Sequence, residues 1–188
     1  MGPEIAQEPN IPNKAQYIIL KHCSRDKLSL SLYQVTYTSR DLKDTCTRKI
    51  RMPLSNTTIL IIGGSSGIGL GVAEKCLSSG AKVHIASSNP VRVQKALCSL
   101  KENHPDASSN ISGYVCDLST DEAETNLSRL LDSTKPLNHI VFTAGDPLSI
   151  KPLQEIDLAS IRQAGHIRFA VPLLLGKHAS KPDVMVPG

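Results

Sequence analysis

The residues best suited to chemistry form a glycine-rich run, Gly-Gly-Ser-Ser-Gly-Ile-Gly at positions 63–69, which directly follows the apolar residues 59–62. A buried strand that enters such a turn and continues into a helix presents free backbone N–H groups to the phosphates of a dinucleotide. A glycine-rich turn without a ligand can have the same composition. The strand before the run and the helix after it, both predicted here, favour dinucleotide binding.

The small residues of this run have separate expected roles. Gly63 allows the tight turn, Gly67 allows the phosphate to approach the backbone, and Gly69 allows the helix to pack closely. Ser65 and Ser66 add hydroxyl donors. We therefore expect all five to contact the cofactor.

The choice of cofactor is expected to depend on the end of the next strand, residues 82–87. An acidic residue there would accept a hydrogen bond from the ribose 2′-OH and favour NAD. This chain instead has Ser88 after the strand and Arg92 one turn into the following helix. A hydroxyl and a cation accommodate a 2′-phosphate, so NADP is favoured over NAD. The alternative is that Arg92 is simply a solvated helix residue.

These residues must be positioned by alternating strands and helices. We expect strands at 59–62, 82–87, 114–116 and 139–143. We expect helices at 67–79, from Asn89 and Pro90 onward, after a capping box formed by Ser119 and Glu122, and at 157–180 with a break before Pro172. Such alternation predicts an α/β fold in which a doubly wound, Rossmann-like parallel sheet carries helices on both faces.

Each of the first three helices should bury one face. The expected buried residues are Ile68, Val72 and Cys76 in the first helix, which ends at Gly80; Val93, Ala96, Leu97 and Leu100 in the second; and Ala123, Leu127, Leu130 and Leu131 in the third. We expect Cys76, Cys98 and Cys116 to be buried free thiols.

Two further segments make the likeness to a known family specific. The run at 63–69 resembles the T-G-x-x-x-G-x-G turn of the short-chain dehydrogenase/reductase family, with Ile62 where Thr is usual. Cys116-Asp117-Leu118 resembles the segment whose Asp contacts the adenine. Phe142-Thr-Ala-Gly145 resembles the N-N-A-G segment, with both Asn replaced.

The three marks occur in the family's order, and the likeness covers residues 57–180. Within the family the chain is most similar to reductases of fungal secondary-metabolite pathways. The resemblance implies an oxidoreductase that moves hydride between a nicotinamide and a carbonyl or alcohol carbon of a small molecule. The cofactor-binding residues that it and the glycine run predict are Gly63, Ser65, Ser66, Gly67, Ile68, Gly69, Ser88, Arg92, Asp117, Ala144 and Gly145.

The family's proton-transfer residues are harder to place. The resemblance implies a Ser, an Asn and a Tyr-x-x-x-Lys pair, yet no Tyr follows Tyr114, and Arg168 falls near the position of the Asn. Tyr17 and Lys21 match the spacing, but they precede the first predicted strand, so we interpret the match as chance. His139 and His166 are interpreted as structural histidines. We assign no catalytic residue.

Three hypotheses follow from the missing pair. The chain is a shortened NADP-dependent oxidoreductase, a catalytically inactive NADP-binding half-domain, or a non-functional fragment. The resemblance also implies that the family's sheet continues past the strand at 139–143. That edge is expected to be open unless residues 157–180 or 17–37 cover it.

Charge and composition bound the remaining possibilities. Residues 1–51 carry nine Lys and Arg against five Asp and Glu, whereas residues 52–188 carry twelve of each. The main domain therefore has no basic excess for nucleic acid, and no apolar run is long enough to span a membrane. We expect no metal site, because no His or Cys cluster has ligand spacing. We also expect a cytoplasmic protein that forms a homo-oligomer.

The expected organisation has three parts. Residues 1–51 form an extension, partly disordered or with a weak strand or hairpin at 17–37. Residues 52–181 form the dinucleotide-binding domain, and residues 182–188 form a tail. One hypothesis is that Met52 is the natural start of the protein.

Overall fold

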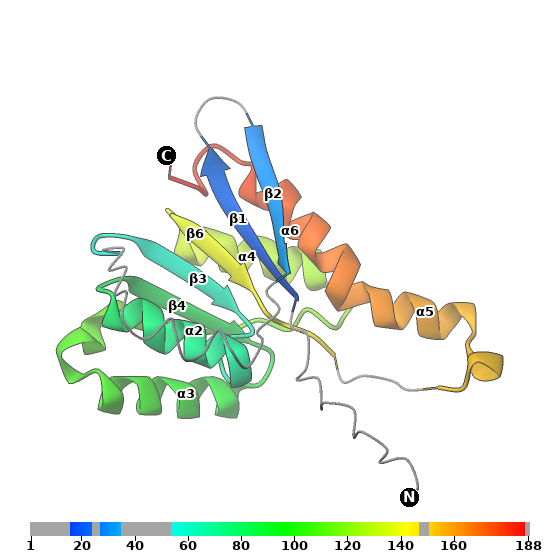
Figure 1. The fold of residues 1–188 in the computed structure, drawn as a ribbon, viewed down its shortest axis with the longest axis horizontal. Coiled ribbons are helices and arrows are strands. Elements are labelled where there is room, and N and C mark those ends of the chain that lie inside the picture. The colour runs from blue at the N-terminus through cyan, green and yellow to red at the C-terminus, as the bar shows by residue number, and fades with distance from the viewer. Residues whose placement is uncertain (1–15, 24–26, 35–53, 147–150, 187–188) are drawn as a thin grey trace, which may run out of the picture.

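The computed structural model describes residues 16–23, 27–34, 54–146 and 151–186, and its centre is a six-stranded sheet in the order β2-β1-β6-β3-β4-β5 (Figure 1). Four of these strands are parallel: β3 (Thr58–Ile62), β4 (Lys82–Ser87), β5 (Ile111–Val115) and β6 (His139–Phe142). Because β4 lies on one side of β3 and β6 on the other, the chain winds in both directions from β3. The predicted doubly wound α/β fold is confirmed.

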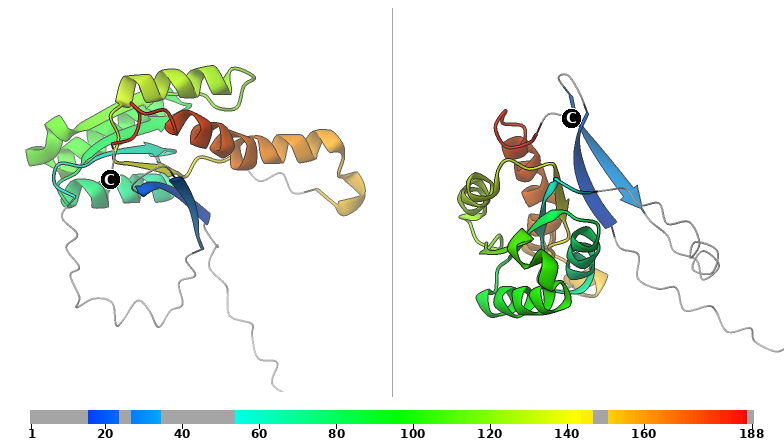
Figure 2. Two further views of the ribbon diagram at one scale, coloured as in Figure 1. Left: turned by 90° about the horizontal axis from the view of Figure 1, so that it is seen from above. Right: turned by 90° about the vertical axis from the view of Figure 1, so that its left-hand side faces the viewer.

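The helices cover both faces of this sheet. They are α2 (Gly67–Ser78), α3 (Pro90–Asn103), α4 (Ala123–Thr134), α5 (Leu158–Gly165) and α6 (Val171–Ala179), with short 3-10 turns at Pro105–Asn110 and Leu153–Glu155. Helices α2 and α3 pack on one face, and α4 and α6 pack on the other (Figure 2). A π-helical turn, His166–Ala170, joins α5 to α6 and forms the expected break before Pro172.

Strand β3 shows why the core forms here. Ile59 and Ile61 pack toward α2 and α3, whereas Leu60 and Ile62 pack toward α4 and α6. All four are at most 3% exposed. A parallel strand covered on both faces is apolar on both, and the run of four apolar residues is the pattern that such burial requires.

Helix α3 begins and packs as expected. The Asn89 side chain accepts a hydrogen bond from the Arg92 backbone N–H at 3.0 Å, and Pro90 occupies the first helical position. Val93, Ala96 and Leu100 are buried, and Leu97, which was also expected to be buried, is partly buried against the same core. The four residues predicted for α4 are all buried. Cys98, on the outer face of α3, is exposed, so the prediction that it is buried was wrong, whereas Cys76 and Cys116 are buried free thiols.

The buried face of α2 differs from the predicted one. It consists of Gly69, Ala73, Cys76 and Leu77, and Ile68 is 48% exposed. The reason is the close approach of Gly69 to the backbone of Gly63, which turns that side of the helix toward the sheet. The prediction that Ile68 packs into the core was therefore wrong.

The capping box predicted before α4 is also absent. Glu122 is the residue that precedes the helix, and no side chain caps it. Ser119 instead donates hydrogen bonds from its backbone N–H and its hydroxyl to Asp117 Oδ1, at 2.9 and 2.7 Å. The Ser119 hydroxyl thus bonds to Asp117 and does not cap the helix.

An N-terminal hairpin covers the edge of the sheet beyond β6. Strands β1 (Gln16–Cys23) and β2 (Lys27–Gln34) pair antiparallel, and β1 pairs antiparallel with β6 (Figures 1 and 2). Of the two segments expected to protect this edge, the N-terminal one pairs with it, through β1. The first fifteen residues and residues 35–53 lie outside the described residues.

The C-terminal residues pack on the domain. Val184 and Met185 are 2% and 4% exposed, and the Val186 N–H donates to the Leu137 carbonyl at 2.8 Å. The packed part of the chain therefore extends past residue 181, the boundary expected from the sequence.

Candidate dinucleotide-binding cleft

The carboxyl ends of the four parallel strands border a cleft of about 570 Å³. This is where ligands bind in open α/β sheets, at the point from which the chain winds in opposite directions. All eleven predicted cofactor-binding residues line it: Gly63, Ser65, Ser66, Gly67, Ile68, Gly69, Ser88, Arg92, Asp117, Ala144 and Gly145. Their role as cofactor contacts stays a prediction, but their assembly around one cleft is a property of the fold.

The glycine turn is built around very close backbone contacts. Gly63 has φ +92°, and a Cβ atom there would lie 2.6 Å from the Ala144 nitrogen. A Cβ atom on Gly69 would lie 2.3 Å from the Gly63 carbonyl oxygen. Gly67 has φ +53° and open space around its Cα, as a close approach of phosphate would require. No side chain caps the start of α2, so the N–H groups of its first turn are available to an anion.

Thr143 ties this turn to strand β6. Its hydroxyl donates to the Ile62 carbonyl at 3.1 Å, and its backbone N–H donates to the same oxygen at 2.8 Å. A Cβ atom on Gly69 would also lie 2.6 Å from the Thr143 hydroxyl oxygen. Sequence reasoning identified the segment 142–145 but missed Thr143 as a cleft residue, because its contacts are with residues about 80 positions earlier.

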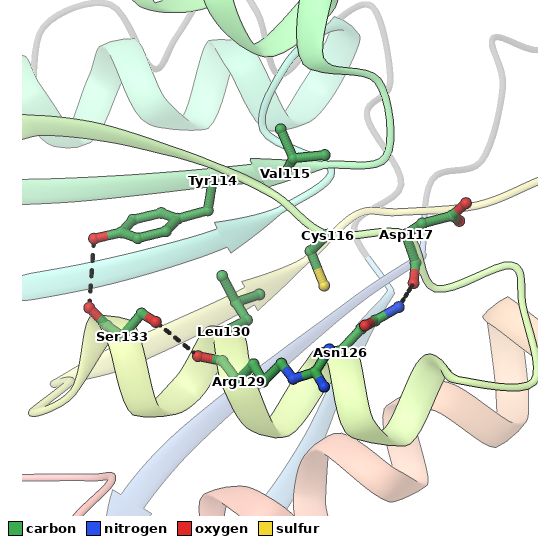
Figure 3. Close-up of a pocket in the computed structure, with 8 residues that line it drawn as sticks. All are labelled: Tyr114, Val115, Cys116, Asp117, Asn126, Arg129, Leu130 and Ser133. Atoms are coloured by element: carbon green, nitrogen blue, oxygen red, sulfur yellow. Dashed lines mark hydrogen bonds between the residues drawn. The ribbon is translucent and has the colours of Figure 1, made fainter.

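Asp117 is held by its own loop. The hydrogen bonds from the Ser119 hydroxyl and backbone N–H lower the pKa of the Asp117 carboxyl, which keeps it ionised. The Asn126 side-chain amide donates to the Asp117 carbonyl at 2.9 Å (Figure 3). Asp117 is therefore oriented by its loop and by α4.

A smaller cavity of about 310 Å³ lies between β5 and α4 and shares Cys116 and Asp117 with the cleft (Figure 3). The Tyr114 hydroxyl donates across it to the Ser133 carbonyl at 3.4 Å. Burial, and then the neighbouring Asp117 charge, raise the pKa of the Cys116 thiol to about 11. Cys116 is thus a protonated thiol that packs in the wall, and not a nucleophile.

The remaining lining residues were not predicted from the sequence as cofactor contacts. They are Ile62, Ser87, Cys116, Leu118, Ser119, Thr143, Asp146 and Ile167. Most adjoin a predicted residue along the chain. Ile167 does not, because it comes from the π-helical turn.

His166 and the Tyr17–Lys21 match, which were considered as catalytic residues, have other places in the fold. The His166 ring nitrogen Nε2 lies 2.9 Å from the Leu118 carbonyl, to which it donates. Tyr17 and Lys21 belong to strand β1, whereas the family carries its pair on a helix. Among the described residues, no group of three His, Cys, Asp or Glu is arranged to hold a metal ion. Nor is any described helix long and apolar enough to cross a membrane.

Known proteins share this arrangement. Residues 51–187 match the family described as the SDR-like Rossmann domain. The short-chain dehydrogenase/reductase fsr5 of Gibberella fujikuroi (strain CBS 195.34 / IMI 58289 / NRRL A-6831) is 41% identical over 134 residues, which are 68% of this chain and 50% of fsr5. The solved MalC reductase/Diels-Alderase of Malbranchea aurantiaca is 39% identical, with a TM-score of 0.66 over 72% of this chain and 54% of MalC.

A more distant structure shares the fold alone. The L-sorbose reductase of Gluconobacter frateurii, solved with NADPH and L-sorbose, is 22% identical, with a TM-score of 0.59 over 69% of this chain and 48% of that protein. The chain thus spans about half the length of the relatives that it matches. The cleft, the strand order and these matches establish that the chain belongs to the short-chain dehydrogenase/reductase family.

Proposed function

We propose that this domain binds NADP(H), with the adenosine half over β4 and β5, the pyrophosphate on the glycine turn and the nicotinamide half beside Ala144 and Gly145. The observation that carries the proposal is the single cleft in which all eleven predicted residues meet. The glycine turn, the N-terminus of α2 and Asp117 line the cleft in the order in which an extended dinucleotide would meet them.

The preference for NADP over NAD is supported by the end of β4. Ser88 and Arg92 line the cleft there, and no described carboxylate pairs with Arg92. A guanidinium donates paired hydrogen bonds to a phosphate, whereas an acidic residue at this place would repel one.

For a whole protein, the proposal is an NADP-dependent oxidoreductase that acts on a carbonyl or alcohol group of a small molecule. Similarity to fsr5 and malC supports a place in fungal secondary metabolism. The second candidate is a binding half-domain without catalysis. It is favoured by one observation: no Tyr follows Tyr114, so the family's Tyr-x-x-x-Lys pair is not among the residues after the third parallel strand.

Titration with NADPH and NADH tests the binding proposal. The chain has no Trp, so the emission of the reduced nicotinamide can be followed directly. We expect NADPH to bind more tightly than NADH, and the Arg92→Gln variant to weaken NADPH about tenfold while leaving NADH within about twofold. Lys101→Gln, an exposed change on the same helix, is the matched control. Equal binding of both nucleotides would refute the NADP assignment, and binding of neither would refute the function.

Turnover separates the two candidates. The 188 residues are expected not to oxidise NADPH in the presence of carbonyl compounds, because no Tyr-x-x-x-Lys pair follows β3 and the one match, Tyr17 and Lys21, lies in strand β1. Carbonyl-dependent oxidation by this chain would overturn that expectation and the binding half-domain with it.

A further inference from the structure

The π-helical turn His166–Ala170 touches both loops that flank the cleft. A π turn is wider than an α turn, and such turns are concentrated at functional sites. Here three consecutive residues, His166, Ile167 and Arg168, each contact a part of the cleft.

The first contact reaches the loop on the adenosine side. His166 Nε2 donates to the Leu118 carbonyl at 2.9 Å, one residue after Asp117. Ile167 is 7% exposed and forms part of the cleft wall. The turn thus fastens the Asp117 loop to the opposite side of the cleft.

The second contact reaches the loop on the nicotinamide side. Arg168 Nη2 donates to the Asp146 carbonyl, and the guanidinium lies against Gly145. A Cβ atom on Gly145 would lie 3.2 Å from Nη2 and 3.4 Å from Cζ. The guanidinium of Arg168 therefore occupies space that a side chain at position 145 would need.

We propose that this π turn is a positioning element for the dinucleotide, in which His166 fixes the adenosine-side loop and Arg168 fixes the nicotinamide-side loop. The inference rests on the proposed NADP(H) binding. Neither residue is assigned a contact with the cofactor. Arg168 acts through the backbone of Gly145 and Asp146, and His166 acts through the backbone of Leu118.

Because the two contacts hold different loops, they should affect different halves of the ligand. The compound 2′,5′-ADP carries the adenosine half and the 2′-phosphate but no nicotinamide. Loss of the Arg168 contact should therefore weaken NADPH and leave 2′,5′-ADP unchanged. Loss of the His166 contact should weaken both.

The experiment titrates the full chain with NADPH and with 2′,5′-ADP. We expect Arg168→Met to weaken NADPH about tenfold and 2′,5′-ADP less than twofold, and His166→Leu to weaken both about fivefold or more. His166→Gln, which keeps a side-chain N–H donor, should recover part of the loss. Arg162→Met, an exposed change on α5, is the matched control and should alter neither ligand.

Amide hydrogen exchange of the ligand-free chain gives a readout that a general loss of stability would not reproduce. Arg168→Met should speed exchange at residues 144–146 and not at 118–119, and Arg168→Lys should show the same pattern if the methionine variant does not fold. Equal weakening of both ligands by the Arg168 variants, or unchanged NADPH binding, would overturn the inference and leave the proposed function intact. Failure of the unmodified chain to bind either ligand would overturn both.

Discussion

Gly69 and Gly71 lie two residues apart in α2, yet alanine should have opposite effects at the two positions. A Cβ atom on Gly69 would lie 2.3 Å from the Gly63 carbonyl oxygen and 2.6 Å from the Thr143 hydroxyl, whereas ordinary contact begins at 3.4 Å. These two atoms belong to the glycine turn and to the residue that follows β6, so the helix must shift by about 1 Å to admit the methyl group. A Cβ atom on Gly71 meets nothing within 4 Å.

The expected free energies follow from these contacts. Forcing a group into a filled site costs about 1–3 kcal/mol of folding stability. Replacing glycine by alanine at an open position inside a helix stabilises it by about 0.5–1 kcal/mol. Gly69→Ala and Gly71→Ala should therefore differ by roughly 1.5–4 kcal/mol in their free energies of unfolding.

Urea denaturation of the two variants and the unmodified chain measures this difference. With a denaturant slope of about 1–3 kcal/mol/M, the two midpoints should be separated by on the order of 1 M urea or more. The shift of α2 should also weaken NADPH binding in Gly69→Ala and leave it unchanged in Gly71→Ala. Equal midpoints and equal NADPH affinities would refute the close packing that we assign to Gly69.

Two further predictions concern ionisable side chains. Hydrogen bonds from Lys177 and His178 lower the pKa of the Glu124 carboxyl, so this contact stabilises the fold above the unfolded pKa of Glu and is lost as the pH falls through the lower folded pKa. Glu124→Gln should thus lower the urea midpoint at pH 7 and not at pH 2.5; an equal effect at both would contradict the assignment. Exposed Cys98 should react with iodoacetamide at pH 8 in the native chain, whereas buried Cys116, with its pKa raised to about 11, should react only on unfolding. Mass spectrometry of the labelled peptides decides this, and rapid native labelling of Cys116 would refute its burial.

The sequence predicted those parts of the fold that depend on local pattern. The strand β3 is a continuous apolar run because it is covered on both faces, and Asn89 with Pro90 marks the start of α3 by the chemistry of its first turn. The cleft residues at 63–69 could be predicted from the strand, glycine turn and helix pattern, whereas Asp117, Ala144 and Gly145 were predicted from the resemblance to the short-chain dehydrogenase/reductase family.

Two of the errors came from packing contacts that helical spacing does not contain. Ile68, Val72 and Cys76 have helical spacing, but the close contact of Gly69 with Gly63 decides which side of α2 faces the sheet. The spacing of apolar residues alone cannot predict that contact. The same holds for Ile167, since a π turn has no local sequence signal, and its place in the cleft depends on how α6 packs on α4.

Strand β6 has a further consequence for the family relationship. Its edges are both occupied, because it pairs parallel with β3 on one side and antiparallel with β1 on the other. A strand has one row of hydrogen-bonding groups on each edge, so an additional family strand could join β6 only by displacing β1. The hairpin and a continued sheet are thus alternatives at this edge.

Removal of the hairpin tests this arrangement. A chain of residues 52–188 should expose the β6 edge, and unpaired edges associate with other strands. We expect such a chain to form larger species in sedimentation velocity at concentrations where the full 188 residues do not, and amide exchange at residues 140–142 to be faster before association. The pairing of Ile18 with Phe142 and of Leu20 with Ile140 would slow exchange in the full chain. If exchange at these residues is the same in both chains, the hairpin does not protect β6, and the edge is free for the rest of the family's sheet.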